Sequence, residues 1–209
     1  MSIDVSICAH PQRLTQAQHL ASTLDAHISV DDGIGILANH DRALAYLADS
    51  GSEWAIILED DAQPIPDFIN QAEAALTHCP TNVASLYLGR NYPTRGQTHI
   101  RSLLEHDPHW IVHHQLRHAV AVAIRPTLIP HLLAAVKDIT HLPADYRWGA
   151  GLQHLHEPIA YSNPSLVNHH DNTPVITTLA SGQPRTRTQP RTAWHAGTRD
   201  TWTSSHLTL

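Results

Sequence analysis

The sequence predicts an α/β protein, folded as a three-layer α/β/α sandwich around a mostly parallel, mixed central sheet. Short apolar runs of strand length alternate along the chain with segments of helical 3.6-residue periodicity, as at 54–58 and 64–78. Residues 54–58 are apolar at nearly every position, which is typical of a central strand covered on both faces. Both observations favour a layered α/β fold.

Length and composition favour a single globular domain. The 209 residues are 42% hydrophobic, enough to form a core without disulfides or a structural metal. The two cysteines, Cys8 and Cys79, are too few for a disulfide framework. No apolar run approaches the ~20 residues of a membrane span, and residues 1–5 do not resemble a signal peptide. We therefore expect a soluble, cytoplasmic protein with no membrane span.

The charge balance argues against an extended nucleic-acid surface. The formal net charge is -6, whereas neutralisation of phosphates by Lys and Arg usually dominates affinity for nucleic acid. The 19 histidines weaken this argument, because they gain charge as the pH falls toward an unperturbed pKa of ~6.5.

In the first half of the chain, strands and helices alternate strictly. The helices are indicated by apolar residues three and four positions apart, and Cys79-Pro80 ends the third. In chain order, we expect a strand at 3–9, a helix at 11–24, a strand at 27–30, a helix beginning near Gly35, the strand at 54–58, a helix at 64–78 and a strand at 83–88.

The second half is less regular. Residues 89–108 have little periodicity and predict a loop beside a site. Beyond it we expect a strand at 119–124, a helix at 127–136, a helix beginning near His141, a strand near Ile159 and a flexible Thr-, Arg- and Pro-rich extension after Thr177. His114 and His118 have the spacing of two metal ligands on a helix, but the residues after them are strand-like, so we reject a zinc site there.

Three carboxylates follow the strand at 54–58 directly: Glu59, Asp60 and Asp61. Ligand sites in α/β sheets lie at the carboxyl ends of strands. Adjacent carboxylates repel one another unless a cation lies among them, and Mg²⁺ or Mn²⁺ suits oxygen ligands. The sequence therefore predicts a divalent-cation site. The alternative is a solvated acidic turn that caps the next helix.

Two further polar residues are candidates for nucleotide binding. Asp31 follows the second strand, where a carboxylate can accept hydrogen bonds from a ribose or a base. Asn39 lies on the inward face of the next helix, where its amide needs partners. Gly33 and Gly35 lack the third glycine of a dinucleotide fingerprint, and no Walker-type motif occurs. Hydride transfer and P-loop phosphoryl transfer are therefore disfavoured.

Two segments resemble motifs of GT-A glycosyltransferases, especially the family-25-like and phage-encoded branches. Residues 57–62, Ile-Leu-Glu-Asp-Asp-Ala, resemble the metal and nucleotide-sugar motif, and residues 164–169, Pro-Ser-Leu-Val-Asn-His, resemble the last conserved block. The resemblance implies that Asp61 is the metal ligand and that His169 completes the coordination. It also implies that Asp145 is the catalytic base, for which a helix cap is the alternative reading.

The resemblance also implies a donor-binding set, which lies at the ends of the first three strands. Its members are His10, Arg13, Asp31, Asn39, Glu59 and Asp60. The donor would be a nucleotide-sugar, with a UDP-sugar favoured, and the cofactor Mn²⁺ or Mg²⁺. The fold would be of the GT-A type, with a single domain at 1–177, a donor-binding half at 1–89, an acceptor half at 90–177 and a tail at 178–209.

The expected activity is metal-dependent transfer of a sugar to a hydroxyl acceptor, which could be a modified DNA base, a virion protein or a glycan. A phage-encoded enzyme would act in the host cytoplasm. A nucleotidyltransferase and a non-catalytic nucleotide-sugar or metal-binding module remain alternatives. In the tail, Arg185, Arg187 or Arg191 could close over the donor phosphates, because the guanidinium fork suits a diphosphate. The tail could instead tether nucleic acid.

Overall fold

In the computed structural model, which describes residues 1–91, 94–170 and 190–209, an eight-stranded mixed sheet forms the centre of the molecule. Its strand order is β10-β6-β8-β5-β7-β3-β1-β2, with four parallel and three antiparallel pairs. The strands are β1 (Ile3–Ala9), β2 (His27–Val30), β3 (Trp54–Glu59), β5 (Val83–Ser85), β6 (Trp110–His113), β7 (Ala121–Ile124), β8 (Ile159–Ser162) and β10 (His206–Thr208).

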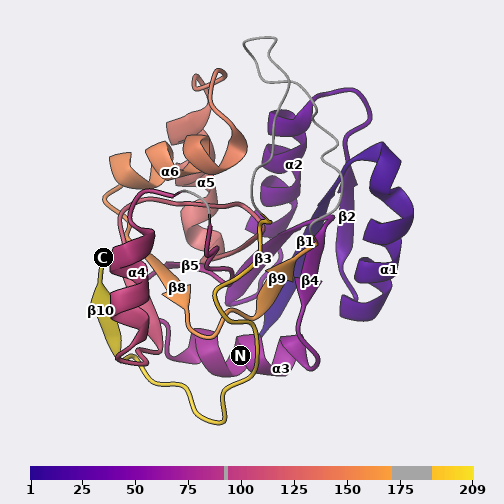
Figure 1. Cartoon of the computed structure of the whole chain (residues 1–209). Helices are drawn as coiled ribbons and strands as arrows, with labels where there is room; N and C mark the ends of the chain where they lie inside the picture. Colours follow the sequence, from indigo (N-terminus) through magenta and orange to yellow (C-terminus); the bar gives the residue numbers. More distant parts are fainter. Residues whose placement is uncertain (92–93, 171–189) are drawn as a thin grey trace.

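Helices cover both faces of this sheet (Figure 1). Helices α1 (Leu14–Leu24) and α3 (Phe68–Thr77) pack on one face, and α2 (Ile36–Ala48), α5 (Ile129–Val136) and α6 (Ala144–His154) pack on the other. Two short 3-10 helices, η1 (Pro11–Arg13) and η2 (Pro126–Leu128), precede α1 and α5. The predicted fold class, a three-layer sandwich of the GT-A type, is confirmed.

The apolar run in β3 explains why both faces are covered. Successive side chains of a strand point to opposite faces. Ile56 and Leu58 belong to the core beneath α1 and α3, whereas Ile57 belongs to the core beneath α2, α5 and α6. All three are at most 1% exposed, and burial of each stabilises the fold by about 1.5–3 kcal/mol. β3 is therefore fixed on both sides, and so is the position of the carboxylates that follow it.

Three predicted boundaries are wrong. The helix predicted from Pro64 begins only at Phe68, because Ala62–Pro64 form a short strand, β4. The strand predicted at 83–88 ends at Ser85. The loop predicted at 89–108 contains a helix, α4 (Gln97–Leu104), whose Ile100 is fully buried. The apolar positions of α4, Ile100, Leu103 and Leu104, span little more than one turn, which is too short a pattern to identify a helix within a polar stretch.

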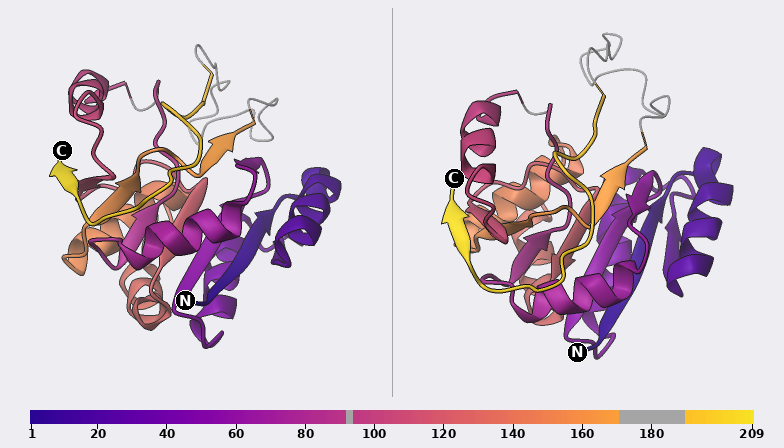
Figure 2. Two further views of the ribbon diagram at one scale, coloured as in Figure 1. Left: turned by 90° about the horizontal axis from the view of Figure 1, so that it is seen from below. Right: turned by 60° about the horizontal axis from the view of Figure 1, so that its bottom comes forward.

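The end of the chain is packed on the domain, although its composition predicts a flexible extension. β10 pairs with β6 at the sheet edge, and Trp202, 5% exposed, lies 5.4 Å from the Trp110 ring. Figure 2 shows this segment passing α3 on its way to β10, and the Trp202 indole donates to Gln71 of α3. Part of the predicted tail, 178–189, lies outside the described residues together with Arg185 and Arg187.

An ion pair between a buried arginine and a partly exposed aspartate joins the two halves of the molecule. Arg147 of α6, 4% exposed, donates to both carboxylate oxygens of Asp41 on α2, at 2.5 and 2.9 Å. Its Nε donates to the carbonyl of Ile139 at 2.7 Å. Truncation of one partner of such a pair leaves an uncompensated buried charge. This pair therefore fixes α6, and Asp145 in its first turn, relative to α2.

Within the described residues, no helix has both the length and the apolar character needed to cross a membrane.

Candidate metal centre

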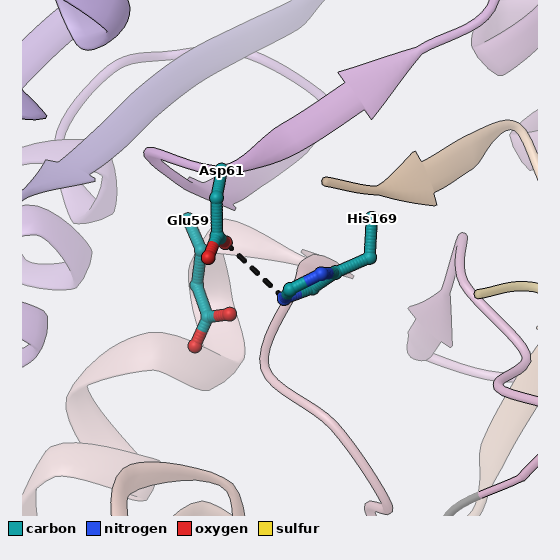
Figure 3. A group of neighbouring side chains, drawn as sticks. All are labelled: Glu59, Asp61 and His169. Atoms are coloured by element: carbon teal, nitrogen blue, oxygen red, sulfur yellow. Dashed lines mark ion pairs between the residues drawn. The ribbon is translucent and has the colours of Figure 1, made fainter. Parts of the chain in front are cut away.

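Two short strands bring Asp61 and His169 together at the carboxyl end of β3. β4 (Ala62–Pro64) pairs antiparallel with β9 (Val167–His169), with Ala62 opposite His169. In addition, the backbone N–H of His170 donates to the carbonyl of Asp61 at 2.9 Å. The backbone register of this two-stranded sheet, rather than side-chain packing alone, therefore holds the two residues side by side. Glu59 is the last residue of β3 and faces the same place (Figure 3).

The three side chains can hold a cation. One ligand atom from each of Glu59, Asp61 and His169 lies within 4.8 Å of the others, and Nε2 of His169 is 3.4 Å from Oδ1 of Asp61. That Oδ1 atom is buried, and no described residue donates a hydrogen bond to it. A buried carboxylate oxygen without a donor has lost its hydration without replacement. Carboxylates and an imidazole form a donor set that Mn²⁺ accepts, so the residues fit the predicted ion.

The pKa values of these carboxyl groups indicate an excess of negative charge in the cluster. Burial, then the negative charge of Asp61, raises the pKa of Glu59 to about 8, and Arg191 opposes the shift. The pKa of Asp60 is also raised, chiefly by burial, although hydrogen bonds from the His10 backbone and from Arg13 oppose this. Several carboxylates confined in one place retain protons because their mutual repulsion is not offset.

Arg13 provides part of the missing positive charge. Its Nη1 donates to Oδ1 of Asp60 at 3.0 Å and to Oδ2 of Asp61 at 2.5 Å. The other oxygen of Asp60 accepts a 2.7 Å hydrogen bond from the backbone N–H of His10. Asp60 thus holds the β1–α1 loop against β3, while the His10 ring caps η1 by accepting from the backbone of Gln12. The structure brings His10, Arg13 and Asp60 together with the metal cluster.

Asp31 and Asn39 have internal partners. Oδ1 of Asp31 accepts from the backbone of Gly33 and Gly35 and so shapes the turn before α2. The buried amide of Asn39 donates to the carbonyl of Ser29 at 3.0 Å and accepts from the Ser29 hydroxyl at 2.8 Å. The partners that the sequence led us to seek in a nucleotide are thus supplied by the protein. A nucleotide-binding role for these two residues stays a prediction.

Asp145 lies in the first turn of α6, where it accepts a hydrogen bond from the backbone of Tyr146. Its charge raises the pKa of Glu59 and also that of Tyr161. Both effects require proximity, because such interactions fall off with distance. Asp145 is therefore electrostatically coupled to the metal cluster from the opposite half of the molecule.

The sequence did not indicate that the aromatic residue Tyr87 lies beside the cluster. The Tyr87 ring lies 6.3 Å from the ring of His169 and 5.1 Å from that of His118. Tyr87 follows the short strand β5, and no motif marks it. His114 is exposed and His118 is buried. In the part of the chain that the structure describes, the group with metal-ligand geometry is Glu59, Asp61 and His169.

Comparison with known proteins adds information on the fold. No family model and no curated protein matches the chain. A197 from STIV aligns with 82% of this chain and 87% of its own length, at 13% identity and a TM-score of 0.49. A mutant Drosophila beta-1,4-galactosyltransferase 7, in complex with manganese, UDP-Gal and xylobiose, aligns with 82% of this chain and 72% of its own, at 8% identity and a TM-score of 0.51. At that identity the second likeness concerns the GT-A-like fold.

Proposed function

We propose that the protein is a metal-dependent glycosyltransferase that moves a sugar from a nucleotide-sugar to a hydroxyl acceptor. The observation that carries the proposal is the cluster of Glu59, Asp61 and His169 at the carboxyl end of β3. The fold is shared with a galactosyltransferase whose structure contains manganese and UDP-Gal, which supports a UDP-sugar as the donor and Mn²⁺ as the ion. The sequence motifs around Asp61 and His169 point to the same chemistry.

In this account, the chain's own residues bind and orient the donor. Asp61 and His169, with Glu59, would hold a divalent cation, whose positive charge would stabilise the leaving diphosphate. Arg13 already contacts Asp61, and Arg191 acts electrostatically on Glu59, so both cations lie where they can donate to diphosphate oxygens. Asp60 positions Arg13 and the His10 backbone around the same place.

Asp145 is the residue that we assign as the general base. Its carboxylate would take the proton from the acceptor hydroxyl as the oxygen forms a bond to the anomeric carbon of the sugar. The bond between that carbon and the phosphate oxygen breaks, and the nucleoside diphosphate leaves with the electron pair. A positioned base typically contributes ~10²–10⁴-fold to the rate. This step describes an inverting enzyme.

Several finer assignments belong to the same proposal. We retain a donor half at 1–89 and an acceptor half at 90–177, to whose sheet residues 190–209 add β10, and membership of a family-25-like or phage-encoded branch. The acceptor would be a modified DNA base, a virion protein or a glycan, and the location cytoplasmic. Arg191 is the member of the proposed arginine lid that lies within the described residues. Its charge acts on Glu59, which favours an arginine lid over the donor phosphates and disfavours a tether for nucleic acid.

Release of nucleotide from a panel of UDP-, GDP- and ADP-sugars, with Mn²⁺ or with a chelator, tests this function. We expect Mn²⁺-dependent hydrolysis of at least one donor in the absence of acceptor. Incubation with nucleoside triphosphates and Mn²⁺ tests the alternative, because a nucleotidyltransferase releases pyrophosphate. Binding of a donor without any turnover would favour the non-catalytic module.

A further inference from the structure

A second concave site lies between α4, β6 and α6, on the acceptor side of the molecule. It encloses about 760 Å³, which is within the range of small-molecule sites. We call it the α4–α6 pocket. Its polar wall includes Arg95, His99, His113, Gln115, Arg117 and Tyr146. Figure 1 shows α4 and α6 at the end of the sheet that is distant from β1 and β2.

The α4–α6 pocket is suited to an anion. Its lining includes two arginines and two histidines and contains no aspartate or glutamate side chain. The Nε atom of Arg117 is buried and has no hydrogen-bond partner among the described residues. Its Nη1 makes a single long contact, 3.4 Å, with the carbonyl of Arg95. A guanidinium in this condition has donors available, and phosphate oxygens match its planar fork.

The pocket adjoins the proposed base. Tyr146 is in its wall and follows Asp145 directly. Behind the wall, the buried Tyr161 hydroxyl donates to the carbonyl of the lining residue Gln115 at 2.6 Å and accepts from the backbone of Arg117 at 2.9 Å. Asp145 therefore lies directly beside the pocket wall, one residue before Tyr146 in the first turn of α6.

Aromatic ring contacts also connect the metal centre with the residues next to the pocket. Tyr87 contacts the ring of His169 in the metal centre and the ring of His118, which follows Arg117 in the chain. Gly89 lies against the same ring, since a Cβ atom there would come within 2.7 Å of Nε2 of His118. Residues 116–118 thus connect the pocket wall, through the Tyr87 ring, to His169.

We propose that the α4–α6 pocket binds the acceptor through a phosphate group, and that the acceptor is a small phosphorylated molecule such as a sugar phosphate. This inference rests on the proposed function, because the pocket is the acceptor site only if sugar transfer takes place. Arg117 and Arg95 hold the phosphate, and the acceptor hydroxyl extends from there toward Asp145. A concave pocket of this size in a chain of net charge -6 favours a small anion over a nucleic-acid backbone, which requires an extended basic surface.

Calorimetry with three probes tests the proposal: glucose 6-phosphate, glucose and inorganic phosphate, all in the presence of a chelator so that the metal centre is not involved. We expect the two phosphates to bind and glucose to give no signal. Arg117→Gln should lower the affinity for glucose 6-phosphate by about tenfold or more, as expected for the loss of a charge-assisted hydrogen bond. Arg95→Gln should also lower this affinity. Because the Arg95 side chain is exposed, this variant should fold even if Arg117→Gln does not.

The matched control is Arg101→Gln, an exposed arginine of the same α4 that is not in the pocket wall. This variant and Asp61→Asn should bind glucose 6-phosphate as the wild type does. Equal binding of glucose and its phosphate, or full affinity in both Arg117→Gln and Arg95→Gln, would overturn the proposal. So would displacement of the bound probe by a duplex oligonucleotide, which would show a nucleic-acid site.

The phosphate pocket and the transferase activity can be refuted independently of each other. Phosphate binding that needs Arg117, in a protein without Mn²⁺-dependent donor hydrolysis, would leave an anion pocket and refute the transferase. Donor hydrolysis without phosphate binding in the chelated protein would leave the transferase and refute the phosphorylated acceptor.

Discussion

Nη1 of Arg13 donates a 2.5 Å hydrogen bond to Oδ2 of Asp61, the carboxylate that we assign to the cation. The same nitrogen reaches Asp60, so a single guanidinium partly neutralises two buried acids. Arg13 comes from the loop after β1, and the acids from the end of β3, strands that are parallel neighbours in the sheet. Their meeting follows from the shared carboxyl edge of the two strands.

The first prediction is that Arg13→Gln separates cation binding from donor binding. Removal of a positive charge next to Asp61 should leave Mn²⁺ affinity unchanged or higher. Donor affinity should fall by roughly tenfold to a hundredfold, because charge-assisted hydrogen bonds to the diphosphate are lost. Calorimetry with Mn²⁺ and then with the active UDP-sugar measures both, and Arg101→Gln is the control. Loss of Mn²⁺ affinity in Arg13→Gln would contradict the assigned roles.

The second prediction concerns Asp145→Asn, which keeps the shape of the side chain and removes its basicity. Transfer should slow by ~10²–10⁴-fold while donor affinity is retained. Asp138→Asn, at an exposed carboxylate beyond α5, should transfer at the wild-type rate. If Asp145→Asn also does so, Asp145 acts only as a helix cap.

The third prediction is a pH dependence of stability. The pKa of Glu59 is about 8 in the folded protein against 4.5 as its ordinary value, so between these values the folded state holds a proton that the unfolded state has lost. Stability must therefore fall as pH rises through this window. In chelator, the thermal midpoint should decline between pH 6 and 8, and less so in Glu59→Gln. Mn²⁺ should raise the wild-type midpoint more at pH 8 than at pH 6, whereas an equal rise would argue against Glu59 as a ligand.

The fourth prediction tests the α5–α6 contact that supports Asp145. A Cβ atom at Gly151 would lie 2.5 Å from Cγ1 of Val136 and 2.8 Å from Cδ1 of Leu132. Gly151→Ala should therefore lower the free energy of unfolding by about 1–3 kcal/mol. Gly149→Ala, in the same helix, meets Leu116 at an ordinary 3.5 Å and should be neutral or stabilising, because alanine favours helix. Urea denaturation of both variants gives the comparison, and equal stability would show that α5 can shift.

Most strands of the central sheet and the acidic group at the end of β3 could be predicted from the sequence because their signals are local. The apolar run in β3 and the carboxylates that follow it are adjacent in the chain, and burial on both faces requires such a run. The clustering of Asp61 with His169 agrees with their two motifs. The pairing of β4 with β9, which creates that proximity, was not predicted. Three-residue strands carry too little pattern to be recognised.

Long-range packing accounts for the remaining differences. Composition predicted a flexible end, yet Trp202 and β10 dock on elements far away in the chain. Asn39 was expected to need a ligand, and Ser29 on the neighbouring strand satisfies it instead. The α4–α6 pocket is made by three elements that sequence alone does not place together. In each case the decisive partner lies in another element, so no local pattern could reveal it.

The most direct test of the central claim is Mn²⁺ binding by calorimetry to the wild type, Asp61→Asn and Asp67→Asn. Asp61 is 3% exposed beside His169, whereas Asp67 is exposed at the start of α3, so the pair separates the metal centre from surface charge. The account predicts one Mn²⁺ site in the wild type and in Asp67→Asn, and none in a folded Asp61→Asn. Undiminished Mn²⁺ affinity in Asp61→Asn would contradict it.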